Sequence, residues 1–217
     1  IASTKAEECQ QIKDSAERDL AEALPELDKA VAVLRNLKVA DLSEVAKYSN
    51  PPAGVKLVME ALCVLKQVPP KMVGAAGQKV ADYWVPGKAM LSNGKELLDS
   101  MFNFDKDNIP EKIIQKLQPY IENEEFTPKK IESASKACTA MCQWVRAMDS
   151  YDRVAKVVAP KREALAKAEA EFAEVSALLA EKKRSLKEVE DKLAALQAQF
   201  KETTEKKEDL ERQSDDC

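Results

Sequence analysis

Apolar residues recur with alternating steps of three and four along the last quarter of the chain. They are Leu165, Ala168, Phe172, Val175, Leu179, Leu186, Val189, Leu193, Leu196, Phe200 and Leu210, with Lys182, Thr203 and Lys207 in the slots between them. This is the heptad spacing of a coiled coil. Because such a seam is buried only against another helix, the pattern predicts a long partner helix elsewhere in the chain.

The only other long helical pattern lies at the start of the chain and extends to about Tyr48. Its apolar ladder is Cys9, Ile12, Ala16, Leu20, Leu24, Leu27, Val31 and Leu34. The ladder is four residues longer than a whole number of heptads, which is a stutter, and Pro25 within it is expected to kink or loosen one turn. We interpret Ala16, Leu20 and Pro25 as positions where the packing phase can change. A static kink in a passive spacer explains the pattern equally well.

Shorter helical patterns separated by proline and glycine fill the region between the two arms. Helices are expected at 52–67, 79–84, 95–102, 110–117, 127–148 and 149–160, with a loop at 74–77 and a turn at Pro86-Gly87. Pro51 and Pro160 mark the two junctions with the arms. We therefore predict an all-α fold, an antiparallel two-helix coiled-coil stalk capped by a compact bundle of about six short helices. The domain boundaries are 1–49, 50–160 and 161–217.

Composition agrees with a helical protein: glycine occurs 5 times, aromatic residues make up 5% and charged residues 33%. No apolar run is long enough to span a bilayer. The chain begins at Ile1 and both ends fall inside helical patterns, so we expect a segment of a larger protein. Residues 50–160 hold 15 basic and 13 acidic side chains, whereas both arms are net acidic. The mildly basic middle region hints at an acidic partner.

The sequence contains no recognisable catalytic or cofactor-binding constellation. It has no histidine, no phosphate-binding glycine loop and no nucleophile elbow, so we expect a non-catalytic chain without a cofactor or metal. Asp105 to Asn108 lacks the glycine and distal glutamate of a calcium loop and reads as a turn. Nucleic acid is disfavoured because basic residues are not clustered with exposed aromatic residues.

The five cysteines fit a reducing, intracellular setting better than a disulfide framework. Without histidine or a Cys-x-x-Cys pair, a structural zinc site is not expected. Cys138 and Cys142 lie one helical turn apart, and we interpret them as two buried apolar side chains, with a redox pair as the alternative. The full set is Cys9, Cys63, Cys138, Cys142 and Cys217.

A binding face is the remaining candidate for function. Lys56 and Glu60 lie away from most of the apolar stripe of the first helix of the middle region, and further basic residues follow at Lys88, Lys95, Arg146, Arg153, Lys156, Lys161 and Arg162. If these segments converge, they form a basic patch. An ordinary solvated surface is the alternative for each of them.

Several sequence blocks resemble the microtubule-binding domain of dynein heavy chains. Asn50-Pro51-Pro52-Ala53-Gly54-Val55-Lys56-Leu57, continuing through Cys63, resembles its opening. Later blocks follow in the right order: Asp82-Tyr83-Trp84, Phe104 to Pro110, Cys142-Gln143-Trp144-Val145, and Tyr151 to Pro160. The resemblance covers essentially the whole chain, and the sequence of these blocks is closer to axonemal dyneins of the inner-arm type than to cytoplasmic dynein. Cytoplasmic relatives carry Lys-Arg where this chain has Lys156-Val157.

The resemblance implies that the head binds the αβ-tubulin interface through its first, third and sixth helices. Lys56 falls on the first, Lys88 and Lys95 fall around the third, and Arg153 and Lys156 fall on the sixth. It further implies that the stalk helices slide by about half a heptad to set affinity. ATP hydrolysis would then occur elsewhere in the parent chain, which would act in the axoneme of cilia and flagella.

The resemblance also leaves room for a dynein light chain on the head, and we expect the chain itself to be a monomer with an intramolecular coiled coil. A structural coiled-coil hairpin with a distal dimerisation head is the alternative from another class of protein. Such heads are rich in glycine and contain strands, unlike the middle region of this chain. A hydrolase hidden in the head is disfavoured by the missing catalytic residues.

Overall fold

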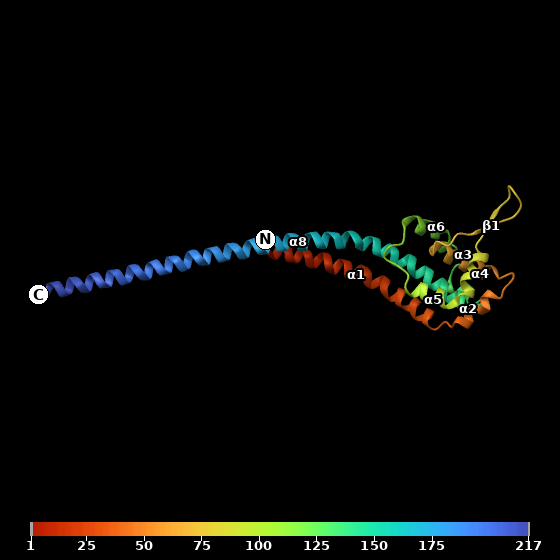
Figure 1. Cartoon of the computed structure of the whole chain (residues 1–217), viewed down its shortest axis with the longest axis horizontal. Helices are drawn as coiled ribbons and strands as arrows, with labels where there is room; N and C mark the ends of the chain where they lie inside the picture. Colours follow the sequence, from red (N-terminus) through yellow and green to blue (C-terminus); the bar gives the residue numbers. More distant parts are fainter. Residues whose placement is uncertain (1, 217) are drawn as a thin grey trace. The chain divides into compact units, whose positions relative to one another are not determined.

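The computed structural model describes residues 2–216 as eight helices and one pair of short strands. Figure 1 shows their order, which is α1 (Ala2–Arg35), α2 (Val39–Ala46), α3 (Ala53–Leu65), β1 (Lys71–Val73), β2 (Val80–Asp82), α4 (Trp84–Ser92), α5 (Gly94–Phe102), α6 (Glu111–Ile121), α7 (Pro128–Ile131) and α8 (Lys136–Asp215). The predicted all-α class, a helical bundle with a coiled-coil stalk, is confirmed. Cys217 lies outside the described residues.

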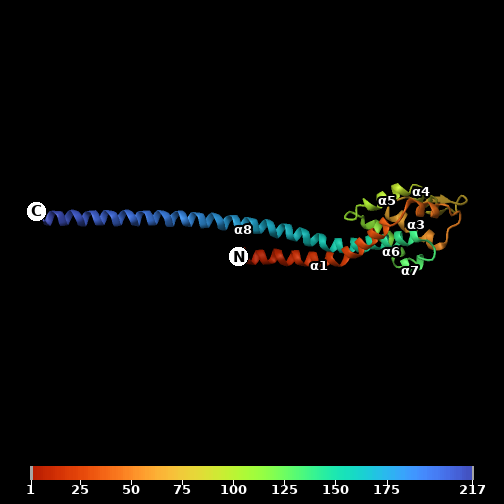
Figure 2. The same ribbon diagram turned by 90° about the horizontal axis from the view of Figure 1, so that it is seen from below.

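The chain forms two compact units. One comprises residues 14–162 and contains the helical bundle; the other comprises residues up to Lys13 together with those from Glu163 onward. In the first unit a single hydrophobic cluster joins the end of α1 to α2, α3, α5, α6 and the first turns of α8. Trp144 is fully buried there and meets the Phe104 ring edge-on at 5.2 Å. Figure 2 shows α3, α4 and α5 within the bundle, where α4 packs on both α3 and α5.

The first arm is shorter than predicted, because α1 ends at Arg35 and α2 is a separate helix. Leu37 is buried in the connection, and the Lys38 N–H donates to Asp41 Oδ2 at 2.8 Å, which caps the start of α2. The new helix packs on α4 and α5. A Cβ atom at Gly94 would lie 3.1 Å from Val39 Cγ1, a tighter contact than most Cβ atoms make, so glycine favours this close approach of α5 to α2.

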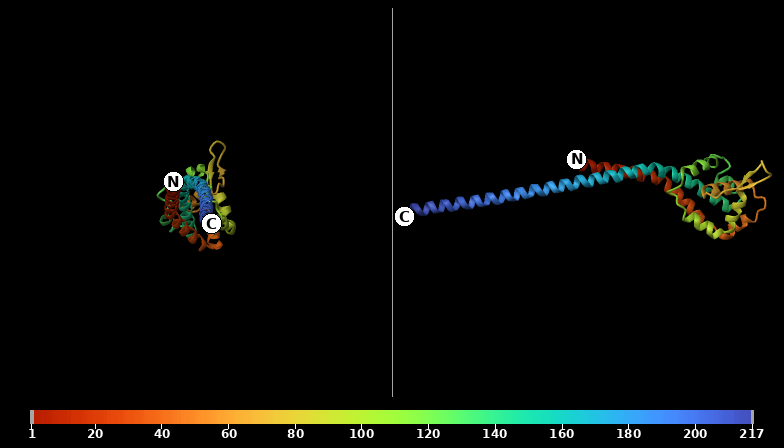
Figure 3. Two further views of the ribbon diagram at one scale, coloured as in Figure 1. Left: turned by 90° about the vertical axis from the view of Figure 1, so that its left-hand side faces the viewer. Right: turned by 45° about the horizontal axis from the view of Figure 1, so that its top comes forward.

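The helix predicted at 79–84 is wrong, because residues 71–82 form a β-hairpin. Lys71 pairs with Asp82 and Val73 with Val80 in an antiparallel ladder. Gly74 and Gly77 adopt positive φ angles of 118° and 89° in the turn, which accounts for the glycines of the expected loop. Figures 1 and 3 show the hairpin projecting from the helices of the bundle.

The turn predicted at Pro86-Gly87 is also wrong, since both residues lie in the first two turns of α4. Proline is tolerated in a first helical turn, and Gly87 is buried against Met59. The helix expected at 127–148 is interrupted after Ile131, and the segment expected at 149–160 is continuous with α8. Pro160 lies within α8 and Pro25 within α1, both exposed and neither ending its helix, whereas Pro51 is buried.

The predicted pairing of the two arms is found in each unit. In the first unit Lys161 Nζ pairs with Asp19 and donates to Ser15 Oγ at 2.8 Å; in the second, Lys5 Nζ lies 2.9 Å from Glu171 Oε2. On α8 the predicted positions from Leu165 to Val175 are sheltered from solvent. From Leu178 onward the stripe has no partner helix among the described residues, and Leu179, Leu186, Val189, Leu193, Leu196, Phe200 and Leu210 are exposed.

On α1 the buried seam differs from the predicted ladder by one residue at two places. Ala23 and Ala30 are buried, whereas Leu24 is 37% exposed and Val31 half-buried. With these two alanines the seam has regular heptad spacing, and its residues are Ala16, Leu20, Ala23, Leu27, Ala30 and Leu34. The extra step of four therefore falls between Ile12 and Leu20, before Pro25.

A strained residue ends α3, and relieving the strain is expected to stabilise the fold. Gln67 has a φ of 57°, and around it the Val68 N–H bonds Cys63 O at 2.9 Å, as in a Schellman motif. Gln67→Gly should raise the free energy of unfolding by about 0.5–1 kcal/mol, because glycine adopts this conformation without a Cβ penalty. Urea denaturation measures it. The control Gln115→Gly, at an exposed position inside α6, should lower stability by about 1 kcal/mol. A loss for Gln67→Gly would contradict the assignment.

Candidate functional site

The first turn of α3 lies against α7 and the turn that leads from α7 to α8. A Cβ atom at Gly54 would be 3.1 Å from Ile131 Cδ1 and 3.9 Å from Ala134 Cβ. Helix α7 begins here because Thr127 Oγ1 accepts from the Lys130 N–H and Pro128 occupies the first helical position. Two chain segments that are about 75 residues apart in sequence thus share one end of the bundle.

Four exposed lysines lie within two residues of Gly54, Ile131 or Ala134 along the chain, and we name them the α3–α7 surface: Lys56 on α3, Lys129 and Lys130 on α7, and Lys136 at the start of α8. Lys56 Nζ donates to Asn50 Oδ1 at 3.3 Å. Within residues 2–216, none of the four forms a salt bridge with a carboxylate. Their charges are therefore available to an acidic partner.

Glu60, the other predicted residue on α3, serves the packing of the bundle. It is half-buried, and its Oε1 accepts from the Tyr120 hydroxyl of α6 at 2.8 Å. Burial, followed by this hydrogen bond, raises the pKa of Tyr120. The contact fixes α3 against α6, so Glu60 positions the helix that carries Lys56.

Lys88 and Lys95 occupy the neighbouring helices α4 and α5. Lys88 is half-buried and Lys95 is exposed. Helix α4 packs on α3 as well as α2, and α5 packs on α2 and α4. Both lysines stay predicted contacts of the bundle, on elements next to the one that carries Lys56.

Arg146 is a structural brace rather than a free surface charge. Its Nη1 atom donates to Phe126 O at 2.9 Å and to Ile121 O at 3.1 Å. These carbonyls belong to the last residue of α6 and to the loop before α7, where backbone acceptors lack helical partners. The guanidinium thus anchors the segment that presents Lys129 and Lys130.

Arg153 and Lys156 form a polar clasp between α8 and α6. Arg153 Nη2 donates to Gln118 Oε1 at 2.6 Å, and Arg153 Nε lies 3.3 Å from Asp149 Oδ2. Lys156 pairs with Glu111 and, at 2.8 Å, with Asp152 Oδ2; the latter contact is ionic rather than a well-aligned hydrogen bond. Asp149 and Asp152 are each only 3% exposed. The two basic side chains therefore neutralise buried carboxylates.

Arg153 and Lys156 lie far along α8 from its first residue, and a single patch that joins them to Lys56, Lys88 and Lys95 stays a prediction. Along α8, Arg153 and Lys156 lie about 25 and 30 Å from Lys136, at 1.5 Å of rise per residue. The structure thus separates the α3–α7 surface from the clasp. Lys161 lies further along and is occupied by Asp19 and Ser15.

Lys129, Lys130 and Lys136 were not among the residues predicted to bind a partner. They lie at the start of the helix that was expected at 127–148. The sequence does contain three lysines within eight residues of a predicted helix start, which could have indicated a basic surface. Nothing in the sequence alone shows that this helix start lies next to the helix of Lys56.

We expect the buried carboxyl of Asp152 to make folding stability depend on pH, and Asp152→Asn should remove this dependence. Burial raises the pKa of Asp152, and Glu111 and Asp149 add to the rise while Lys156 opposes it. Because the pKa of Asp152 is higher in the folded than in the unfolded chain, its contribution to folding stability is greatest below the unfolded-state pKa of about 3.9. That contribution is lost as pH rises through the folded-state pKa. The stability of the native chain minus that of Asp152→Asn should therefore fall as pH rises from about 3.5 to 6. Urea unfolding across this range measures the difference. A difference that rises would show that the ion pair outweighs burial.

The three buried cysteines are inert by environment. Burial raises the pKa of Cys138 to about 11 and that of Cys63 and Cys142 to about 12. The interpretation of Cys138 and Cys142 as buried side chains is confirmed, since both are fully buried and neither is in a disulfide. Over residues 2–216 no cluster of three potential metal ligands is found, and no helix is long and apolar enough to cross a membrane.

Comparison with known proteins places this geometry in a family. Residues 2–216 match the family described as the microtubule-binding stalk of dynein motor, and the chain belongs to that family. It is 50% identical over 218 residues to dynein axonemal heavy chain 1 of Homo sapiens and 44% identical over 220 residues to dynein axonemal heavy chain 3 of Homo sapiens. Each match covers 100% of this chain but only 5% of the relative.

A solved structure with a similar fold is the microtubule binding domain of dynein-c. It is 47% identical in sequence, with a TM-score of 0.59, and the match covers 67% of this chain and 95% of that one. The family and this fold agree with the resemblance seen in the sequence.

Proposed function

We propose that this chain binds the αβ-tubulin interface of the microtubule through the α3–α7 surface. The observation that carries the proposal is the group of four exposed lysines, free of salt bridges among the described residues, on two segments that meet at one end of the bundle. Tubulin is acidic, so these charges give both steering and salt-sensitive affinity. Lys88 and Lys95 are proposed to flank the contact.

We further propose that Arg153 and Lys156 support binding from within the bundle. Both are held by carboxylates of α6 and α8, and they lie far along α8 from the α3–α7 surface. Their role would be to keep α8 fixed against α6. A direct contact with tubulin, as the sequence suggested, stays a prediction for these two residues.

The whole parent protein is proposed to be an axonemal dynein heavy chain, because the relatives that the chain matches over its full length carry that name. Residues 50–160 would then form the head and residues 1–49 and 161–217 the stalk. ATP hydrolysis would take place elsewhere in the parent chain. We expect the chain alone to be monomeric, and a dynein light chain is a candidate partner of the head.

Microtubule co-sedimentation of this chain at low and raised salt tests the proposal. Binding should be saturable and should weaken as salt rises, because exposed charges are screened over about 10 Å at 0.1 M ionic strength. Lys56→Ala should weaken binding, and Lys156→Ala should weaken it less. Absence of binding at low salt by a chain with native circular dichroism would reject the proposed function.

The stalk register should control this affinity. Lys161 contacts both Ser15 and Asp19, which lie one turn apart on α1, so a disulfide from position 161 to either one favours a different offset of the helices. We expect Lys161→Cys with Ser15→Cys and Lys161→Cys with Asp19→Cys, both made in a background without Cys9 and Cys217, to differ in microtubule affinity by about 5-fold or more. The reduced forms should bind alike. Equal affinities of the two oxidised forms would mean that the stutter is only a bend.

A further inference from the structure

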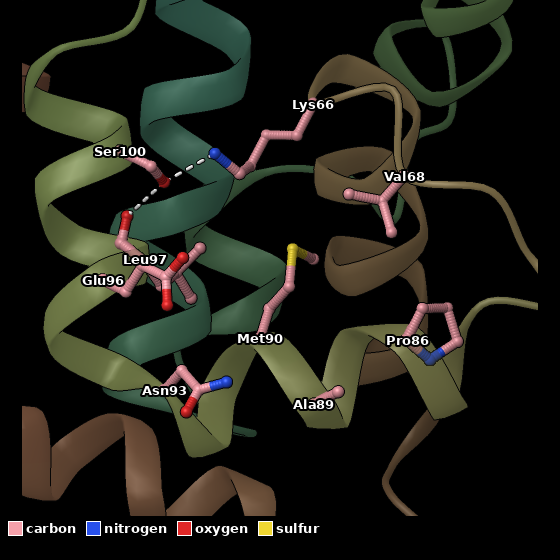
Figure 4. A pocket seen from close by; sticks show the side chains of 9 residues that line it. All are labelled: Lys66, Val68, Pro86, Ala89, Met90, Asn93, Glu96, Leu97 and Ser100. Carbon is pink, nitrogen blue, oxygen red and sulfur yellow. Dashed lines mark hydrogen bonds between the residues drawn. The ribbon is translucent and has the colours of Figure 1, made fainter.

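A cavity of about 390 Å³ lies between the end of α3 and helices α4 and α5. Figure 4 shows the side chains that line it: Lys66, Val68, Pro86, Ala89, Met90, Asn93, Glu96, Leu97 and Ser100. Its size falls within the range of about 300–1,000 Å³ that is usual for sites of small molecules. It is separate from the α3–α7 surface, and none of the proposed tubulin contacts lines it.

Helical spacing builds two walls of this cavity. Pro86, Ala89 and Met90 form one face of α4, and Asn93, Leu97 and Ser100 continue along one face of α5. The third wall is the capped end of α3, where the Schellman motif around Gln67 fixes both Lys66 and Val68. The walls are therefore mostly apolar and belong to regular, packed elements.

The polar residues of the cavity are Lys66, Asn93, Glu96 and Ser100, and the Lys66 ammonium group is the cation among them. Figure 4 shows it reaching from the end of α3 toward α5, where Nζ donates to Ser100 Oγ at 2.6 Å. Ser100 Oγ in turn donates to Leu97 O at 2.7 Å. In the part of the chain that the structure describes, no carboxylate forms a salt bridge with Lys66. Burial lowers its pKa, and the more distant Glu96 only partly opposes this effect.

We propose that the cavity binds a small molecule with an apolar body and one carboxylate. The apolar side chains of α4 and α5 cover the body, and the Lys66 ammonium group, which forms no salt bridge with Glu96 of the same cavity, receives the carboxylate. A half-buried cation that forms no salt bridge favours an anion over a neutral or cationic ligand, and the Glu96 carboxylate in the same wall limits the ligand to one anionic group. The volume limits the ligand to a small molecule.

Binding of phenylbutyrate tests this inference, with phenylbutanol as the matched neutral probe. Phenylbutyrate is titrated into the whole chain, and binding is measured by isothermal calorimetry and by amide chemical shifts. We expect saturable binding with a Kd of about 1 mM or tighter. Phenylbutanol should bind about 10-fold more weakly, and the shifted amides should belong to α4, α5 and the end of α3. No saturation at about 10 mM, or equal affinity of the two probes, would overturn the proposal.

Three variants separate the cavity from nonspecific binding. Lys66→Met should remove the preference for phenylbutyrate over phenylbutanol, whereas Lys112→Met, at an exposed lysine of α6 outside this cavity, should leave it unchanged. Ala89→Trp, at an exposed wall position, should block both probes without touching Lys66. Retained preference in folded Lys66→Met, or retained binding in Ala89→Trp, would contradict the assignment. The test needs no microtubules, so its outcome is independent of the proposed function.

Discussion

Reversing the charges of Lys129, Lys130 and Lys136 together is expected to lower microtubule affinity about 100-fold, at roughly 1 kcal/mol for each lysine. The reason is that all three are exposed and free of salt bridges within residues 2–216, so glutamate at these positions would repel an acidic partner. Co-sedimentation at low salt measures the loss. Since the side chains are exposed, the bundle should remain folded.

A control for this prediction must carry the same net charge. The exposed residues Lys112 and Lys116 of α6, with Lys183 of α8, can be changed to glutamate in the same number. This second triple variant should lose less than about 5-fold in affinity, through long-range electrostatics alone. Equal losses in both triple variants would show that net charge, rather than the α3–α7 surface, determines binding.

Arg146→Met is expected to lower the free energy of unfolding by about 2–4 kcal/mol, because hydrogen bonds from a charged donor contribute about 1.5–3 kcal/mol each and two carbonyls would lose their partner. Arg146→Lys should recover part of the loss, since a single ammonium group cannot match the planar guanidinium at both carbonyls. Urea denaturation measures both variants. Arg162→Met, at an exposed arginine of the same helix, should change stability by less than about 0.5 kcal/mol.

A loss below about 1 kcal/mol for Arg146→Met would mean that water satisfies the carbonyls of Ile121 and Phe126 equally well. If the brace acts as described, the same variant should also weaken microtubule binding, because α7 would lose its anchor. Urea denaturation reports the effect of Arg146→Met on the stability of the whole fold, and microtubule binding reports its effect on the segment that carries α7.

The long helices could be predicted from the sequence because heptad spacing is a property of the chain itself. On α8 the seam residues from Leu165 to Val175 are where the spacing placed them. On α1 the buried seam contains Ala23 in place of Leu24, which keeps regular heptad spacing from Ala16 to Leu34. Hydrophobicity alone does not reveal that choice.

The head was less predictable because tertiary contacts determine its local structure. Residues 79–84 read as helix, yet the paired strand at 71–73 and two glycines with positive φ make residues 79–82 part of a hairpin. Likewise, Pro86-Gly87 resembles a turn until Gly87 is seen to pack on Met59. In each case a non-local partner outweighed the local signal.

The candidate site shows the same division between local and non-local information. Lys56 was identified from its place on an amphipathic helix, but its neighbours Lys129 and Lys130 depend on the contact between α3 and α7. Arg146 was taken for a surface charge because its acceptors are backbone carbonyls, which leave no signature in the sequence. Charge can be counted from the sequence, whereas its partners require the fold.

Protection of individual lysines by microtubules tests the proposed surface most directly. Amine labelling of the whole chain, read by mass spectrometry with and without microtubules, reports each lysine separately. We predict that Lys56, Lys129, Lys130 and Lys136 become protected, while Lys112 and Lys116 label as before. Unchanged labelling of all four, with protection confined to Lys156 or to α6, would contradict the account.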